Sequence, residues 1–205
     1  MKTIVKPWGS EYLLYENDNI AIWHLLINPY KQTSLHSHPN KKTGLVILDG
    51  AAKVSFLGGD TKLFYGEKIM IRHGVFHQTK NMTDSVLQLL EIENPVNKND
   101  IVRLDDAYGR AGTSDMGEDG GYISPIDINH CFVGRCEILL RSLTQNDFEY
   151  HRSDIDSFII TDGTINSHGY AVASPGDILS YKNLTILVQR FGLANKISGI
   201  SIKSW

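Results

Sequence analysis

Two histidines separated by a single residue, His36 and His38, are the side chains whose type and spacing first suggest chemistry. On a β-strand, residues i and i+2 point to the same face, so the two imidazoles can converge on one ion. Neutral imidazole is the commonest metal ligand in proteins. The pair predicts a metal site if further ligands join it. The alternative is a polar pocket that the histidines line without a metal.

A third histidine, His77, follows a turn glycine, Gly74, in a segment that opens at Gly66 and ends at Asn81. With this segment the sequence resembles the cupin family, which has two motifs, G-x5-H-x-H-x(3,4)-E-x6-G and G-x5-P-x-G-x2-H-x3-N. The first motif is matched by His36, His38 and Gly50, and the second by Gly66, Gly74, His77 and Asn81.

Three positions depart from the cupin pattern. Thr43 stands where the first motif has its glutamate ligand, Arg72 replaces the proline, and the segment 28–30 lacks the opening glycine. The resemblance implies a divalent metal held by His36, His38 and His77, with Zn²⁺ as the first choice and Fe²⁺, Mn²⁺ or Ni²⁺ as alternatives. Three histidines leave open positions for water and substrate, as catalytic sites require.

The flanks of the histidine segments are similar to the cupin domain of type II mannose-6-phosphate isomerases. The similarity covers residues 6–110, from the Lys-Pro-Trp-Gly start at Lys6 to the Asp-Ile-Val-Arg…Tyr-Gly-Arg stretch that ends at Arg110. That family interconverts mannose 6-phosphate and fructose 6-phosphate with a divalent metal, often Zn²⁺. The resemblance therefore implies a phosphorylated sugar as the substrate.

The same resemblance gives candidates for substrate binding and catalysis. Lys41 stands where the family usually has arginine, Arg110 is the candidate for the sugar phosphate, and the motif asparagine Asn81 is a third substrate-binding candidate. Solvated surface charge is the alternative for both cations. Candidates for the general base are His73, a hydroxide ion on the metal, or Glu91 if its strand parity points inward.

The elements that must position these residues are expected to be strands. Apolar or alternating segments recur between turn residues at 20–27, 45–48, 53–57, 62–65, 69–71 and 86–92, and again at 137–143, 158–161, 170–173, 178–181 and 184–191. The pattern predicts an all-β protein of two tandem cupin barrels, that is, double-stranded β-helices of the jelly-roll type. We expect an N-terminal cupin domain over 1–110, a linker or long loop over 111–121, and a degenerate C-terminal cupin domain over 122–205.

The C-terminal half offers a weaker candidate site. Counting back from Gly163 by the spacing of the first cupin motif places Glu149, His151 and Asp156 at the ligand positions. Counting forward from Gly176 places Leu187 where the last histidine should stand, so this half is expected mainly to pack against its partner barrel or another subunit.

Composition limits the partners. A formal net charge of −3 and an apolar content of 41% favour a globular protein and argue against nucleic acid or a membrane surface as partner. The N-terminus has no apolar signal-peptide core, which favours a cytoplasmic location. Cys131 and Cys136 are expected to be inert thiols, and the cupin resemblance is compatible with a homodimer.

Three functions compete at this stage. The first is a metal-dependent isomerase or epimerase that acts on a sugar phosphate or a nucleotide sugar, with a role in polysaccharide biosynthesis. The second is a carbohydrate-binding or accessory cupin without catalysis, motivated by Thr43 at the glutamate position. The third, less favoured, is an iron-dependent oxygenase.

Overall fold

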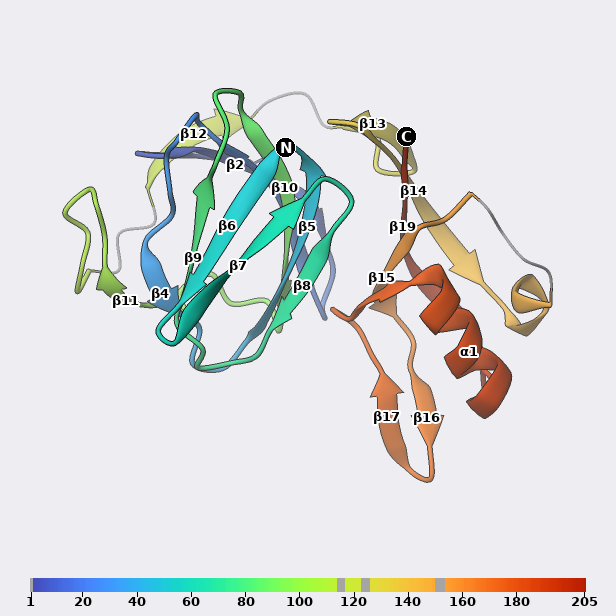
Figure 1. Cartoon of the computed structure of the whole chain (residues 1–205). Helices are drawn as coiled ribbons and strands as arrows, with labels where there is room; N and C mark the ends of the chain where they lie inside the picture. The colour runs from blue at the N-terminus through green and yellow to red at the C-terminus, as the bar shows by residue number, and fades with distance from the viewer. Residues whose placement is uncertain (1, 114–116, 123–125, 150–153) are drawn as a thin grey trace. The chain divides into compact units, whose positions relative to one another are not determined.

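The computed structural model describes residues 2–113, 117–122, 126–149 and 154–205, which form two compact units, Met1–Ile126 and Asp127–Trp205. Both units are built mainly from antiparallel strands, so the all-β prediction is confirmed (Figure 1). Within the described residues, no helix is long and apolar enough to cross a membrane.

The first unit consists of two antiparallel sheets (Figure 1). The larger sheet has the order β12-β1-β2-β3-β10-β5-β8, and its strands are β12 (Glu118–Tyr122), β1 (Lys2–Lys6), β2 (Gly9–Glu16), β3 (Ala21–Ile27), β10 (Leu87–Asn94), β5 (Lys42–Asp49) and β8 (Lys68–Ile71). The smaller sheet has the order β11-β4-β9-β6-β7, and its strands are β11 (Val102–Asp105), β4 (Leu35–Ser37), β9 (His77–Asn81), β6 (Ala51–Phe56) and β7 (Gly59–Phe64).

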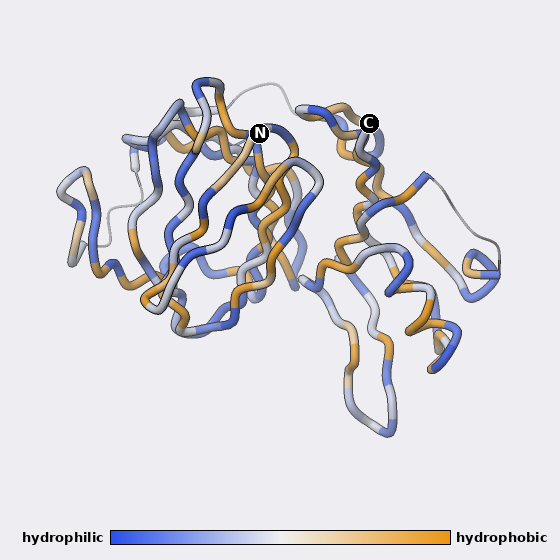
Figure 2. The backbone as a smooth tube through the Cα atoms, viewed as in Figure 1, coloured by the Kyte–Doolittle hydropathy of each residue, from blue (hydrophilic) through white to orange (hydrophobic). Residues whose placement is uncertain are grey.

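The inward faces of several strands change from apolar to charged along their length. On β10, Leu87 and Leu89 belong to the apolar core, and by strand parity Glu91 and Glu93 continue the same face. In the same way Ile4 of the core is followed on β1 by the buried Lys6. The unit therefore has an apolar core at one end of these strands and a polar site at the other, and the hydropathy of the strands is shown in Figure 2.

Strand β12 begins inside the segment 111–121, for which the sequence analysis expects a linker or long loop, and ends one residue beyond it. Its residues pair antiparallel with β1, in a register that sets Glu118 opposite Val5. Gly120 allows this pairing, since a Cβ there would lie 3.0 Å from a side-chain atom of Thr3. The pairing of Glu118–Tyr122 extends the first unit past residue 110, as the compact unit of residues 1–126 also shows.

The second unit contains a five-stranded sheet, a two-stranded ribbon and one α-helix. The sheet order is β13-β14-β19-β15-β18, with strands β13 (His130–Val133), β14 (Cys136–Leu143), β19 (Ile197–Ser204), β15 (Ser157–Asp162) and β18 (Ile178–Ser180). The ribbon pairs β16 (Ile165–Ser167) with β17 (Tyr170–Ala173), and a short 3₁₀ helix covers Gln145–Phe148. The two cysteines are buried free thiols, and burial raises the pKa of Cys131 to about 11.

The strand predicted over 184–191 is wrong, because Tyr181–Phe191 forms the helix α1. Ser180 caps its N-terminus by accepting a hydrogen bond from the Asn183 amide. Leu184 and Val188 are buried in the core of this unit, and the apolar residues of the segment recur at the i, i+3, i+4, i+7 spacing of a helix: Leu184, Leu187, Val188 and Phe191.

Gly9 is a position where the backbone excludes a side chain. Its φ is +152°, and a Cβ there would lie 1.9 Å from the carbonyl oxygen of Leu26 on the neighbouring strand. We expect Gly9→Ala to lower the free energy of unfolding by about 1–3 kcal/mol, measured by denaturant titration with tryptophan fluorescence. Gly58→Ala is the matched control, because a Cβ there meets no atom within 4 Å. Equal stability of the two variants would contradict this close approach.

Candidate functional site

The three histidines of the sequence prediction come together at one end of the first unit. His36 lies on β4 and is paired in register with His77 at the start of β9, while His38 follows directly after β4. Their ring centroids lie 4.5 Å (His36 to His77), 4.8 Å (His36 to His38) and 5.4 Å (His38 to His77) apart. All three side chains are buried.

Backbone carbonyls fix the tautomer of each imidazole. The Nδ1 atoms of His36, His38 and His77 lie 2.9, 2.6 and 3.0 Å from the carbonyl oxygens of Ser34, Asp100 and Val75, respectively. A carbonyl oxygen only accepts, so each Nδ1 carries the proton and each Nε2 keeps its lone pair. This is the arrangement in which histidine binds a metal through Nε2.

Burial also keeps the imidazoles neutral. It lowers the pKa of His38 to about 3, and the nearby Lys41 acts in the same direction. It lowers the pKa of His36 well below its ordinary value, and the imidazoles of His77 and His38 add to this effect. Burial also lowers the pKa of His77. Neutral imidazoles are the form that binds metal.

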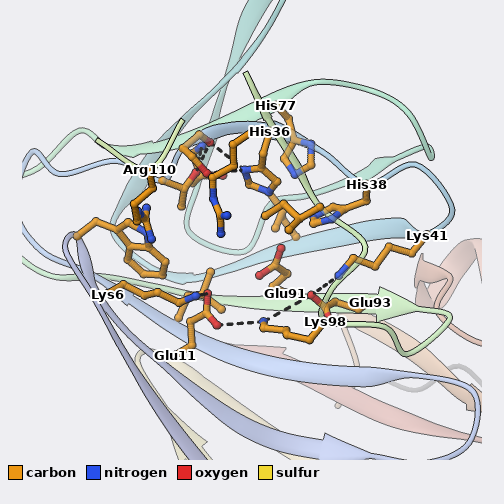
Figure 3. A pocket seen from close by; sticks show the side chains of 18 residues that line it. Lys6, Glu11, His36, His38, Lys41, His77, Glu91, Glu93, Lys98 and Arg110 are labelled. Atoms are coloured by element: carbon orange, nitrogen blue, oxygen red, sulfur yellow. Dashed lines mark hydrogen bonds and ion pairs between the residues drawn. The ribbon is translucent and has the colours of Figure 1, made fainter. Parts of the chain in front are cut away.

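Glu91 completes the cluster from the opposite sheet. One oxygen of its carboxylate and one nitrogen of each imidazole all lie within 4.8 Å of one another. Four atoms bound tetrahedrally to one ion at about 2.1 Å lie about 3.4 Å apart, so the widest separation in the group must close by about 1.4 Å for all four to share an ion. Figure 3 shows the carboxylate of Glu91 rising toward the three histidines.

The donor set fits a divalent metal. Within the described residues, Nε2 of His38 is buried without a hydrogen-bond partner, and such an atom needs a ligand, an ion or a water. Three imidazoles and a carboxylate are ligands that Zn²⁺, Fe²⁺ and Mn²⁺ accept. The cluster could therefore hold a divalent metal.

Lysines and glutamates alternate beside the cluster and form what we call the charge row. Lys41 Nζ lies 2.7 Å from Glu93, Lys98 Nζ lies 3.6 Å from Glu93 and 3.0 Å from Glu11, and Lys6 Nζ lies 3.3 Å from Glu11 (Figure 3). Lys98 also lies over the ring of Trp23, 3.9 Å from its centroid. Each charged group of the row has a partner of opposite sign, as buried ions require, and its three lysines and two glutamates leave a net charge of +1.

The charge row sets the ionisation of its members. Burial favours the neutral form of Glu11, but Lys98 and Lys6 outweigh it and lower its pKa. Burial raises the pKa of Glu91 to about 7, with Glu93 and Glu11 acting in the same direction and Lys98 against it. Burial lowers the pKa of Lys6. Burial acts in the same direction on Lys98, but the carboxylates of Glu11, Glu93 and Glu91 outweigh it and raise the pKa of Lys98.

A pocket connects the cluster and the charge row with two arginines. Its cavity has a volume of about 50 Å³ and opens to solvent. Arg103 and Arg110 line it together with the three histidines and Glu91. Arg110 donates to both oxygens of Asp106, at 3.1 and 2.9 Å, and these bonds lower the pKa of Asp106 although burial opposes them.

The loop between β10 and β11 holds the histidine segment in place. The carboxylate of Asp100 accepts hydrogen bonds from the amides of Asn40 (2.9 Å) and Lys41 (3.0 Å) and from the Asn40 side chain (2.8 Å). The carbonyl of Asp100 is the partner of His38, and the carbonyl of Asn97 accepts from Lys41 Nζ at 3.1 Å.

The remaining candidates occupy other positions. Lys41 lines the pocket, but its ammonium group is bound by Glu93 and Asn97, so it is not a free cation for a substrate. Asn81 is fully buried and donates to the carbonyls of Ile27, Asn28 and Ser85, which gives it a structural role in this loop rather than a place in the pocket. His73 lies on an exposed turn and is not among the described residues that line the pocket.

The candidate site of the C-terminal half is not assembled by the described residues. The carboxylate of Asp156 accepts hydrogen bonds from the backbone and side chain of Ser204 and forms an ion pair with Lys203. It therefore binds the C-terminal end of β19. Glu149 is exposed, and His151 lies outside the described residues.

Sequence reasoning missed most of the charge row. Lys6, Glu11, Glu93, Lys98 and Arg103 were not candidates, although all of them line the pocket. The signal was present on β10, where Glu91 and Glu93 interrupt an otherwise apolar strand face.

A family model described as Mannose-6-phosphate isomerase C-terminal matches residues 1–106, about half of the chain. The mannose-1-phosphate guanylyltransferase of Sinorhizobium fredii is 28% identical over 106 residues, which are 51% of this chain and 21% of that protein. The enzyme of the same name from Escherichia coli is 29% identical over 112 residues, 53% of this chain and 23% of that protein. The chain thus spans less than a quarter of the length of these two relatives.

Among solved structures, a sugar phosphate isomerase of the cupin superfamily from Silicibacter pomeroyi aligns with a TM-score of 0.40 and 19% identity. The alignment covers 42% of this chain and 59% of that one.

The buried histidines make the stability of the metal-free protein depend on pH. A histidine whose pKa falls from about 6.5 in the unfolded chain to below about 4 in the folded one binds its proton only on unfolding. It therefore lowers stability by up to about 1.4 kcal/mol per pH unit as the pH falls through that window. His24, with a pKa lowered to about 4 by burial, acts in the same direction as the three site histidines.

Glu91 opposes this effect, because its raised pKa stabilises the fold at low pH and that contribution is lost as the pH rises through about 7. Four histidines outweigh one glutamate, so we expect chelator-treated protein to unfold at lower denaturant concentration at pH 5 than at pH 7. The check is a denaturant titration at both pH values in the presence of chelator. Equal or greater stability at pH 5 would contradict neutral buried imidazoles.

Proposed function

We propose that this chain is a metal-dependent protein that isomerises or epimerises a sugar phosphate or a nucleotide sugar. The chain belongs to the mannose-6-phosphate isomerase C-terminal family, and its N-terminal unit is a cupin. The observation that carries the proposal is the cluster of His36, His38, His77 and Glu91 at the wall of a pocket that also contains arginines. The pocket thus offers a metal for an oxygen-rich ligand and cations for an anionic one.

The metal would supply Lewis acidity, since a divalent ion polarises a carbonyl oxygen and makes the neighbouring C–H bond more acidic. His36, His38 and His77 would hold it through Nε2, with the carbonyls of Ser34, Asp100 and Val75 fixing the rings. Of the two side chains predicted as the general base, only Glu91 lines the pocket. The apolar residues Trp8, Leu25, Leu45 and Ile101 also line the pocket.

The anionic group of the substrate would bind near Arg110. Figure 3 shows Arg110 and Lys6 on the side of Glu91 that lies away from Lys41. Asp106 holds the guanidinium of Arg110 through Nε and Nη2, which fixes its plane toward the pocket. A planar, fixed guanidinium is well suited to a phosphate group.

The names of the relatives support this substrate class. The matched family is described by mannose 6-phosphate isomerisation, and the two relatives by mannose 1-phosphate. A phosphorylated hexose is therefore the first substrate to test, and a polysaccharide precursor pathway is the proposed context.

Binding of a carbohydrate without turnover is the second candidate. It is favoured by the state of the other acids and bases near the pocket: Glu11 and Glu93 are paired with lysines, and His73 lies on an exposed turn. In that case the metal and the arginines would select a ligand, and no proton transfer would follow.

The experiment is a panel of hexose phosphates and nucleotide sugars incubated with metal-loaded protein and followed by NMR in deuterated water. Conversion of one compound, with loss of activity after chelation and recovery with Zn²⁺ or another divalent ion, is the expected result. Saturable, metal-dependent binding of a panel member without conversion would support the second candidate instead. Failure of the metal-loaded protein to convert or bind any member would contradict both.

Arg110→Lys tests the anion-binding role. It keeps a positive charge beside Asp106 but removes the guanidinium N–H groups that Asp106 does not occupy and that a phosphate would accept from. We expect KM for the phosphorylated substrate, or Kd if there is no turnover, to rise about 10-fold or more, as loss of a charge-assisted hydrogen bond predicts. Arg72→Lys is the control, because Arg72 is exposed and is not among the described pocket residues. An unchanged KM in the Arg110 variant would exclude it from phosphate recognition.

A further inference from the structure

We infer that Glu91 is a fourth ligand of the metal, a carboxylate supplied by β10 to a site whose histidines come from the opposite sheet. The inference rests on metal binding in the proposed function and assigns Glu91 to the metal rather than to proton transfer as a free base.

The geometry places the carboxylate within reach of the same ion. Glu91 shares a face of β10 with the core residues Leu87 and Leu89, and it is paired in register with Trp23 and Leu45, whose side chains also lie in the core. Its side chain therefore points inward by strand parity. At that position, one carboxylate oxygen of Glu91 and one ring nitrogen of each of the three histidines all lie within 4.8 Å of one another.

Glu91 differs from the other two glutamates of the pocket, Glu11 and Glu93, because in the described part of the chain only those two form ion pairs with lysines. Glu11 is paired with Lys6 and Lys98, and Glu93 with Lys41 and Lys98. Glu91 is equally buried, yet within the part of the chain that the structure describes it has no hydrogen bond or ion pair of this kind. A buried carboxylate is costly unless a cation accompanies it, and the group it faces is the cluster of imidazoles.

The charges agree with this assignment. The three imidazoles are neutral and keep their Nε2 lone pairs, so they bring no negative charge to a divalent ion. One carboxylate brings the metal and its ligands from +2 to +1, while the charge row, with three lysines and two glutamates, carries a net charge of +1 of its own. Glu91 thus supplies the negative charge that the histidines lack.

The inference also accounts for Thr43. This residue lies on β5 beside β10, in register with Glu93, and its side chain shares the inward face with Leu45 and Ile47. A threonine hydroxyl is a poor ligand compared with a carboxylate. The carboxylate therefore comes from the neighbouring strand, two residues along β10 from the position opposite Thr43.

Co²⁺ binding by the full-length chain, purified without a histidine tag and stripped with chelator, tests the inference without any substrate. The visible spectrum of Co²⁺ reports the number and type of its ligands, and a competition titration gives the affinity. We expect Glu91→Gln to weaken Co²⁺ binding by at least about 100-fold, more than the loss of a group that only orients a ligand, and to change the spectrum. Glu93→Gln is the matched control on the same strand face, and it should keep the wild-type spectrum.

Thermal melts of the metal-free variants guard against a structural explanation. Glu91→Gln removes a buried charge without a partner, so its metal-free form should melt no lower than the wild type, while its gain in Tm on adding Co²⁺ should shrink. If Glu91→Gln does not fold, Glu91→Asp replaces it, with the carboxylate set back by one methylene group and weaker binding again expected.

Three outcomes would overturn the inference. The first is wild-type affinity and spectrum in the Glu91 variant, which would leave a three-histidine site and the proposed function intact. The second is an equal loss of affinity in the Glu91 and Glu93 variants, which would indicate a general electrostatic effect. The third is a wild-type protein that binds neither Co²⁺ nor Zn²⁺, and this result would also remove the metal from the proposed function.

Discussion

The cost of burying charge inside a β-barrel governs this site. The inward faces of β1, β2 and β10 combine apolar core residues with Lys6, Glu11, Glu91 and Glu93, so ionisable groups are buried beside the core. Such groups persist only when they are paired, neutral or bound to an ion. The charge row meets the requirement by pairing, and the histidines by staying neutral. Glu91 has neither kind of partner among the described residues, burial raises its pKa to about 7, and the proposed metal would compensate its charge.

The same constraint explains which sequence-based predictions succeeded. Strands of the first unit follow from alternation and turn residues, and the histidines of one strand could be placed on one face from their spacing alone. The helix Tyr181–Phe191 was missed because its short apolar runs, such as Ile186–Val188, look like a strand unless the 3.6-residue period is counted. Local pattern therefore gave most of the fold of the first unit and less of the second.

The site was harder to predict, because most of its contacts join residues distant in the sequence. Lys41 is a cation at the expected position, yet its partner Glu93 lies 52 residues away and removes it from substrate recognition. Asn81 belongs to the motif for a structural reason, since its amide closes a turn between strands. That Glu91 and not His73 reaches the histidines depends on the pairing of β10 with β3 and β5, which no spacing rule supplies.

The arrangement of Asp100 gives the loop between β10 and β11 an unusual status. Surface loops normally accept insertions and deletions because little depends on their path. Here one residue of the loop ties down the chain just after His38 through its side chain and orients the imidazole through its carbonyl. A change of even one residue in loop length would displace that carbonyl and so reach the imidazole. Among relatives of this protein, the length of this loop should therefore vary less than that of other loops, and it offers a marker for which of them keep the same site.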